Sequence, residues 1–248
     1  MAASAPEDPL TAARRLATVA TVAGLTVAGL AAARADPVIL PQPGTGAWRP
    51  LAFRSVGRTT TYAAVSIDGV DAMRADSDCA ASALWLALDD IDLGRTPHLS
   101  WRWKVERGLE VPDERIAAGD DFAARVYVLF QLDAARATLG QRLRHRLGRL
   151  LYRREPPGSA LNFVWASHSE IGAVWDNPFA DTSKMVVVAT GRSPGWRREE
   201  VDLGARYRAL FESAPPPLLG LAIMSDTDNT CQKATAWFAD FRFRGGGR

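Results

Sequence analysis

The sequence predicts an all-β protein, an antiparallel β-sandwich or jelly roll with one inserted basic amphipathic helix and a second short helix. Short β-branched or alternating runs recur along the chain with turn residues between them. The chain has 248 residues, of which 47% are hydrophobic, and this is enough for one packed core. Eight or nine short strands with few helices between them are typical of this architecture.

Residues 1–35 are expected to be a signal peptide. Arg14 and Arg15 precede the uncharged stretch 16–33, and the triplet 33–35, Ala-Arg-Ala, offers small residues at both cleavage positions. This predicts a periplasmic or secreted protein, exported by the general or the twin-arginine route. The alternative is an uncleaved anchor, because the uncharged stretch approaches the length that spans a bilayer. Removal of this segment lowers the net charge from +2 to +1, which argues against a nucleic-acid partner.

A single β-sandwich domain is expected over residues 51–244. An extended lead-in rich in Pro and Gly precedes it over 36–50, and a disordered tail follows over 245–248. The alternating run 99–105 is typical of a half-buried strand in an antiparallel sheet. The expected strands are 59–65, 82–88, 99–105, 120–130, 161–166, 185–190, 219–224 and 235–243.

The strand over 120–130 is expected to build the core with one face and to carry functional groups on the other. A period of two places the apolar side chains together and the polar ones opposite them. The apolar face is Phe122, Ala124, Val126, Val128 and Phe130, and the opposite face is Asp121, Ala123, Arg125 and Tyr127.

Two segments interrupt the strands. Residues 134–155 combine leucines at helical spacing with seven arginines, which indicates a basic amphipathic helix inserted between two strands. Such a helix suits peripheral contact with an anionic membrane or a partner protein, or else it lies solvated over a sheet edge. The second segment, 201–211, is expected to be a short helix ahead of three prolines.

Four stretches occur in the order GDDFAARVYVLF, LNFVWA, VDLGARYRALF and LAIMSDTDNT. In these stretches the chain resembles a bacterial family of exported proteins known only as a domain of unknown function. The resemblance covers nearly the whole chain after residue 47, implies a β-sandwich and assigns no activity. The closing stretch AWFADFRF is also similar to the final strand of many jelly-roll carbohydrate-binding modules.

Arg125 lies in the middle of an otherwise apolar strand, and this is costly unless a carboxylate pairs with it. Asp121, Asp226 or Asp228 should therefore meet it on one sheet face. Such a cluster either fixes the strand register or recognises a polar ligand such as a saccharide. The expected ligand-binding residues are Asp121, Arg125, Tyr127, Trp165, Asp226, Asp228 and Asn229, with Asn162 close by.

The loop SDTDNT, residues 225–230, also offers carboxylates to a metal ion. Asp226 and Asp228 could supply part of a calcium shell, although the loop lacks the spacing of an EF-hand. No other cofactor is expected, and the alternative is a turn shaped by side-chain hydrogen bonds. Cys79 and Cys231 either form a disulfide in an oxidising compartment or stay as two buried thiols.

The leading hypothesis is a non-catalytic periplasmic module that binds a polar ligand, most plausibly a glycan of the cell envelope. One alternative is a glycoside-active enzyme that pairs Asp121 with Asp226 or Asp228. Against this alternative, Arg125 would keep the Asp121 carboxylate ionised as its ion-pair partner, and an ionised carboxylate cannot donate a proton. The other alternative is a structural envelope protein that docks through the basic helix over 134–155.

Overall fold

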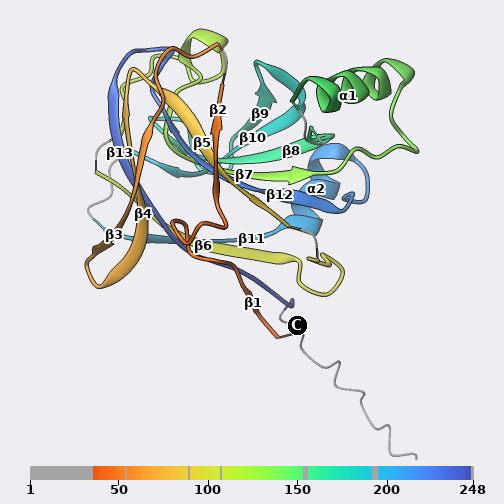
Figure 1. Ribbon diagram of the computed structural model, residues 1–248, viewed down its shortest axis with the longest axis horizontal. Helices are drawn as coiled ribbons and strands as arrows, with labels where there is room; N and C mark the ends of the chain where they lie inside the picture. The colour runs from red at the N-terminus through yellow and green to blue at the C-terminus, as the bar shows by residue number, and fades with distance from the viewer. Residues whose placement is uncertain are drawn as a thin grey trace, which may run out of the picture. The chain divides into compact units, whose positions relative to one another are not determined.

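The computed structural model describes residues 36–246 except 54, 89, 107, 153–155 and 192–194, so the expected signal peptide lies outside the described residues. Figure 1 shows two β-sheets packed face to face with two helices at their margins. This confirms the predicted β-sandwich. Within the described part of the chain, no helix is long and apolar enough to cross a membrane.

The described residues form thirteen strands, more than the eight or nine expected. The additional strands include β4 and β11. Their sequences, VDAMRADSD and RREEVD, are polar and lack the hydrophobic pattern that predicts a strand. The strands are β1 Val38–Ile39, β2 Arg49–Ala52, β3 Thr61–Ile67, β4 Val70–Asp78, β5 Ala81–Ala87, β6 His98–Val105, β7 Phe122–Phe130, β8 Ser159–Ala166, β9 Val174–Asn177, β10 Ala180–Thr190, β11 Arg197–Asp202, β12 Leu218–Asp226 and β13 Lys233–Arg244.

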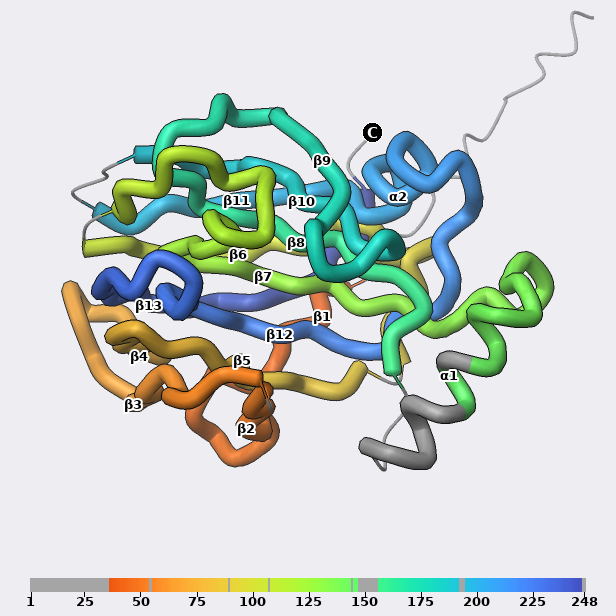
Figure 2. Tube along the Cα trace, turned by 90° about the horizontal axis from the view of Figure 1, so that it is seen from above, coloured from red at the N-terminus to blue at the C-terminus, as the bar shows by residue number. Residues whose placement is uncertain are grey.

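One sheet has six strands in the order β11-β6-β13-β4-β3, with β1 added on β13, and the other has seven in the order β2-β5-β12-β7-β8-β10-β9. Neighbouring strands are antiparallel except β8 and β10, which run parallel. Figure 2 follows β12, β7 and β8 side by side across the seven-stranded sheet. The connections β4–β5 and β12–β13 cross from one sheet to the other.

The core lies between the two sheets and is aromatic. Trp101 and Trp103 of β6 point inward, as the alternation predicted, and each is fully buried. They meet Phe163 and Trp165 of β8, with ring centroids 5.6 Å and 5.4 Å apart. Alternate residues of β6 and β8 therefore join the sheets, and the intervening residues are free to carry polar groups on the outer faces.

The expected lead-in over 36–50 is extended, but it is not separate from the domain. Strand β1 pairs with β13 of one sheet, and β2 pairs with β5 of the other. The sandwich thus begins before residue 51. At the other end, residues 245–246 have no regular structure, and the rest of the expected tail lies outside the described residues.

Helix α1, Leu139–Tyr152, occupies the middle of the segment predicted to be helical, of which 153–155 are not described. Leu139 is 84% exposed and Leu143 is 59% exposed, so this part of its apolar side is not packed on the sheet. Helix α2, Leu203–Phe211, begins two residues later than predicted because Val201 and Asp202 end β11. The Asp202 side chain accepts a 2.8 Å hydrogen bond from the Ala205 backbone N–H and caps α2.

Candidate functional site

Arg125 projects from the middle of β7 on the outer face of the seven-stranded sheet, yet its side chain is only 1% exposed. Its Nε donates to Asp226 Oδ1 at 2.8 Å and its Nη2 donates to Asp226 Oδ2, a bidentate pair. Its Nη1 donates to Asp120 Oδ2 at 3.2 Å and to the Tyr127 hydroxyl at 3.1 Å. The ring of Phe122 lies beneath the guanidinium, with its centroid 4.5 Å from Cζ. Hydrogen bonds along the edge of the guanidinium and a ring on its face therefore fix the Arg125 side chain.

The partner on the β7 side is Asp120, not Asp121 as the sequence predicted. Opposite β12, Arg125 pairs with Met224 and Phe122 pairs with Asp226, so three steps along β7 match two steps along β12. The extra residue is a β-bulge, and it shifts the alternation of faces by one. Phe122 consequently joins Arg125 on the outer face, and Asp120 takes the place expected for its neighbour.

Asp121 instead organises the loop after β12. Its Oδ1 accepts from the Asn229 backbone N–H at 3.1 Å, and its Oδ2 accepts from the N–H and the hydroxyl of Thr230, both at 2.6 Å. The Asn229 side chain donates to the Ala117 carbonyl, and the Thr227 N–H donates to the Ala80 carbonyl at 3.0 Å. Within SDTDNT, side-chain and backbone hydrogen bonds therefore fix one turn geometry.

The disulfide alternative for the two cysteines is confirmed. Cys79 and Cys231 are bonded, and they lie on the connections β4–β5 and β12–β13, two of those that cross between the sheets. The Cys79 N–H also donates to the Gln232 carbonyl at 3.0 Å. The bridge closes a sequence separation of 152 residues, and in the chain-entropy model a loop of this size contributes about 5 kcal/mol to the free energy of unfolding. It also anchors the loop that carries Asp228.

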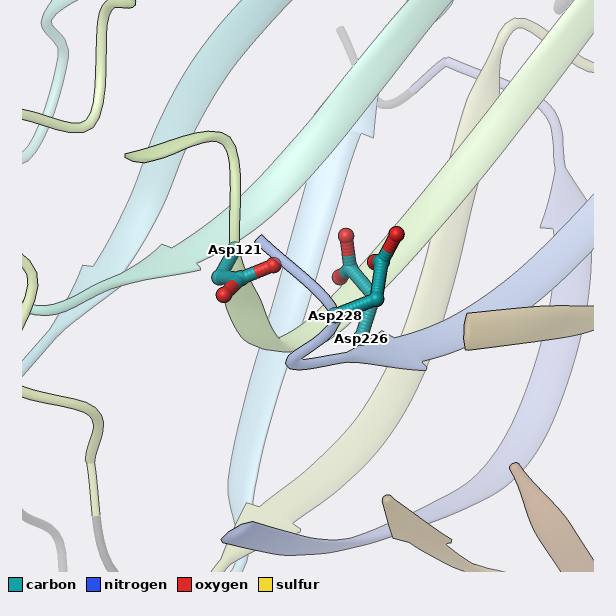
Figure 3. A group of neighbouring side chains, drawn as sticks. All are labelled: Asp121, Asp226 and Asp228. Atoms are coloured by element: carbon teal, nitrogen blue, oxygen red, sulfur yellow. The ribbon is translucent and has the colours of Figure 1, made fainter. Parts of the chain in front are cut away.

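Asp121, Asp226 and Asp228, called the Asp cluster below, gather where β7 begins and β12 ends (Figure 3). One carboxylate oxygen from each lies within 4.8 Å of the other two. Asp121 and Asp226 are buried and Asp228 is half-buried. Asp240, an acidic residue of β13, lies on the other sheet, where it pairs with Arg102. Asp121 directly precedes β7, Asp226 ends β12, and Asp228 lies in the loop that follows β12.

The environment of the cluster shifts the pKa values of its groups. Burial raises the pKa of the Asp226 carboxyl, and the Arg125 guanidinium opposes that shift. Burial also raises the pKa of Asp120 and of Asp228, for which the nearby Asp121 carboxylate adds to the effect. Burial disfavours the charge of Arg125, but the carboxylates of Asp120 and Asp226 outweigh it and raise its pKa. Burial is thus the largest cause of the raised carboxyl pKa values, and the neighbouring carboxylates add to it.

Trp165 does not belong to this site, and its assignment as a ligand-binding residue is wrong. Val164, not Trp165, stands opposite Arg125, so the tryptophan points to the other side of the sheet. It is 1% exposed in the core, and its Nε1 donates to the Gly191 carbonyl at 2.7 Å. Asn162 does share the outer face, since it stands opposite Tyr127. In a strand, residues an odd number of positions apart point to opposite faces, so Asn162 and Trp165 cannot share one. The sequence alone could therefore have excluded the tryptophan.

A cavity of about 580 Å³ opens beside Arg125 on this outer face. The segment after β2, with Phe53 and Val56, forms one wall, and the turn between β9 and β10, with Phe179, forms the opposite one. Phe179 is 65% exposed, and it was not among the predicted site residues. Its signal is the short polar-aromatic turn Asn-Pro-Phe between two strands. Of the predicted site residues, those lining the cavity are Arg125, Tyr127, Asp226, Asp228 and Asn229.

The chain matches one protein-family model and is similar, at low identity, to several solved structures. The model of the family described as "Protein of unknown function (DUF3047)" matches residues 46–242, and no curated protein matches the chain. The fold is similar to a family 30 carbohydrate-binding module from a cellulosomal cellulase of Clostridium thermocellum, at 13% identity and TM-score 0.40 over 86% of this chain and 95% of that one. A family 11 carbohydrate-binding module of the same organism is similar at 10% identity and TM-score 0.43, over 85% of this chain and 95% of that one. Endoglucanase 3 of Trichoderma harzianum, from family GH12, is similar at 8% identity and TM-score 0.36, over 75% of this chain and 85% of that one.

Proposed function

The chain belongs to the DUF3047 family, whose description names no activity, and we propose from its own site that it binds a saccharide of the cell envelope without chemical conversion. The observation that carries the proposal is the outer-face cavity, where a rigid Arg-Asp network lies beside an exposed aromatic side chain. The proposal includes export of the protein, as the N-terminal sequence predicts. The ligand would be a polar sugar unit on a longer chain.

The size and lining of the cavity suit a sugar unit. A volume of about 580 Å³ falls within the range of about 300–1,000 Å³ that is usual for small-molecule sites. Asp120, Asp228 and Asn229 offer hydrogen-bond groups, while Phe53 and Phe179 offer apolar ring faces. Sugars present hydroxyl groups at their edges and C–H groups on their faces, and this cavity can meet both.

The polar groups are also ordered before a ligand arrives. Arg125 is fixed by Asp120, Asp226 and Tyr127, and Asp121 fixes the loop that carries Asp228. A ligand therefore pays little conformational entropy in the protein when it binds. This arrangement favours recognition over a structural role alone, because the network leaves Asp228 and Asn229 facing the cavity.

The same contacts disfavour hydrolysis by paired aspartates. A glycosidase needs one carboxyl group that gives a proton and a second that acts as nucleophile or base. Both oxygens of Asp226 accept hydrogen bonds from Arg125, and its Oδ1 also accepts from the Phe122 N–H at 3.3 Å. Asp121 accepts three hydrogen bonds from the loop. Within the cluster, the other two carboxylates are thus engaged as hydrogen-bond acceptors, and neither is set up as the proton donor that would complement Asp228.

Substitution Phe179→Ala tests the proposal at the cavity rim. We expect the affinity for a bound oligosaccharide to fall at least about fivefold, because loss of a stacking ring costs about 1 kcal/mol or more. Stability should hardly change, since Phe179 is largely exposed. Isothermal titration with hexasaccharides of glucose, xylose, N-acetylglucosamine and glucosamine measures the affinity, and the release of reducing ends reports any hydrolysis.

The matched control is Ile171→Ala, which removes another exposed apolar side chain, one that does not line the cavity. It should leave every affinity as in the parent protein. Equal losses in both variants would show that the cavity is not the binding site. Release of reducing ends by the purified protein would contradict the non-catalytic proposal.

A further inference from the structure

Among the described residues that line the outer-face cavity, acidic side chains outnumber basic ones. Asp120, Asp226 and Asp228 all line it, and Arg125 is the one cationic side chain among the described lining residues. Asp121 adds a further carboxylate within 4.8 Å of two of them. Arg125 is shared between Asp120 and Asp226, so Asp228 has no cationic side chain paired with it among the described residues. The charge balance of the site is therefore incomplete.

An unfilled acceptor points in the same direction. The Asp120 side chain lines the cavity and the residue is only 4% exposed, yet its Oδ1 accepts no hydrogen bond within the described part of the chain. Its other oxygen accepts from Arg125. A buried carboxylate oxygen normally has a donor, because an unsatisfied one keeps its full desolvation cost. The missing partner is thus a hydrogen-bond donor that enters through the cavity.

The geometry of the Asp cluster suits an ammonium group. An ammonium donates three hydrogen bonds of about 2.8 Å in tetrahedral directions, which places its acceptors about 4.6 Å apart. The three carboxylate oxygens lie within 4.8 Å of one another. The half-buried Asp228 faces the cavity, and a cation beside it would offset the burial and the Asp121 charge that raise its pKa.

A calcium ion fits the same residues less well. Calcium takes six to eight oxygen ligands, and most lone pairs of Asp121 and Asp226 are already engaged by N–H and O–H donors. Asp226 accepts from Arg125 with both oxygens, and Asp121 Oδ2 accepts from two donors. The guanidinium 2.8 Å from Asp226 Oδ1 would also repel a dication. An ammonium group carries one charge and needs only three acceptor oxygens, so it requires fewer free lone pairs than calcium does.

We propose that the cavity selects a saccharide that carries a free, protonated amino group, such as a glucosamine unit without its acetyl group. This inference rests on the proposed saccharide binding. The ammonium lies against Asp228 and the Asp cluster, and the sugar ring lies toward Phe179. An acetylated amine has lost its charge and two of its N–H donors and carries a bulkier group. A neutral glucan has no cation for Asp228.

The test compares three hexasaccharides on the full chain by isothermal titration: glucosamine, N-acetylglucosamine and glucose. We expect the glucosamine hexamer to bind at least about tenfold more tightly than the other two, since charge-assisted hydrogen bonds exceed neutral ones in strength. In Asp228→Asn the affinity for the glucosamine hexamer should fall at least about tenfold more than the affinities for the other two hexamers.

The control Asp71→Asn removes an exposed acid on the other sheet and corrects for general attraction of a cationic oligomer. It should keep the preference intact. Equal affinities for the three hexamers, or a preference that Asp71→Asn lowers as much as Asp228→Asn, would overturn the inference and leave saccharide binding in place. No binding of any hexamer would overturn the proposed function and the inference together.

A titration with calcium chloride alone separates the metal alternative. Calcium binding that Asp228→Asn abolishes, together with loss of the glucosamine preference when calcium is present, would assign the cluster to a metal and overturn the inference. A glucosamine preference that survives a chelator supports it.

Discussion

The two outer faces of the sandwich each carry an arginine in the middle of a strand, and the two side chains differ in how far water reaches them. Arg102 of β6 alternates with the core tryptophans, as Arg125 of β7 alternates with core valines. The side chain of Arg102 is 35% exposed and pairs with Asp240, while that of Arg125 is 1% exposed and pairs with Asp226. One ion pair is solvated and the other is withdrawn from water.

The difference arises from what covers each face. On the seven-stranded sheet, Leu51, Phe53 and Val56 pack over the outer side of β5 and β12, together with Met224 and Tyr127. On the six-stranded sheet, Lys104 and Arg102 lie over the rings of Trp237 and Trp196, with distances of 5.7 Å to each centroid, and both stay in contact with water.

A covered arginine must have its hydrogen bonds satisfied by the protein, whereas an exposed one can use water. This contrast explains why the partners of Arg125 are enclosed by the protein and those of Arg102 are not. The comparison also predicts how much each arginine contributes to stability.

Substitution Arg125→Met should have the largest effect, a loss of about 3–5 kcal/mol in the free energy of unfolding. It removes the positive charge and leaves the buried carboxylates of Asp120 and Asp226 without a partner. Urea unfolding at pH 7 measures the loss. A change below about 1 kcal/mol would mean that water reaches both carboxylates and that the buried description of this face is wrong.

The double variant Arg125→Met with Asp226→Asn keeps that experiment interpretable if the single variant fails to fold. It removes one buried charge together with its partner, so part of the lost stability should return. A double variant no more stable than the single one would assign the cost to lost packing rather than to an unpaired carboxylate.

Much of the sandwich could be predicted from local sequence. The alternating run around Trp101 and Trp103 identified β6 and its buried face, because a half-buried strand leaves a period of two in the hydrophobic pattern. The polar strands β4 and β11 could not be found in this way. Their partners in the sheet, and not their own side-chain pattern, make them strands.

The candidate site was predictable in its centre and not in its details. A lone arginine in an apolar strand required carboxylates, and Asp226 is indeed its bidentate partner. The choice between Asp120 and Asp121 depended on a β-bulge, which arises from the pairing of β7 with β12. Nothing in two adjacent identical residues reveals which one the bulge turns outward. The walls of the cavity, including Phe179, come from distant segments brought together by folding.

Tyr127 offers a smaller test of how well this face excludes water. Burial raises the pKa of Tyr127 to about 12, with Arg125 opposing the shift. Below pH 10 its contribution to stability is complete, and it declines as the pH rises through 10 toward 12, because the unfolded chain ionises first. At pH 11 the parent protein should have lost about 1 kcal/mol more stability, relative to pH 8, than Tyr127→Phe has lost.

Urea unfolding of both proteins at the two pH values gives this difference. Tyr62, whose pKa burial also raises, is present in both proteins, and its contribution cancels. Equal losses in the parent and in Tyr127→Phe would indicate that the Tyr127 hydroxyl ionises as it does in water.

Substitution Arg102→Ala should have the smallest effect, and it decides whether position or burial governs the energetics. Its guanidinium and the Asp240 carboxylate are both reached by water, and Arg242 Nη2 stands 3.9 Å from the same carboxyl group. Exposed ion pairs contribute about 0–1 kcal/mol, so urea unfolding should show a loss in that range. A loss as large as that of Arg125→Met would mean that an arginine at mid-strand is costly to remove whatever covers it. The contrast between the two faces would then be one of geometry rather than of solvation.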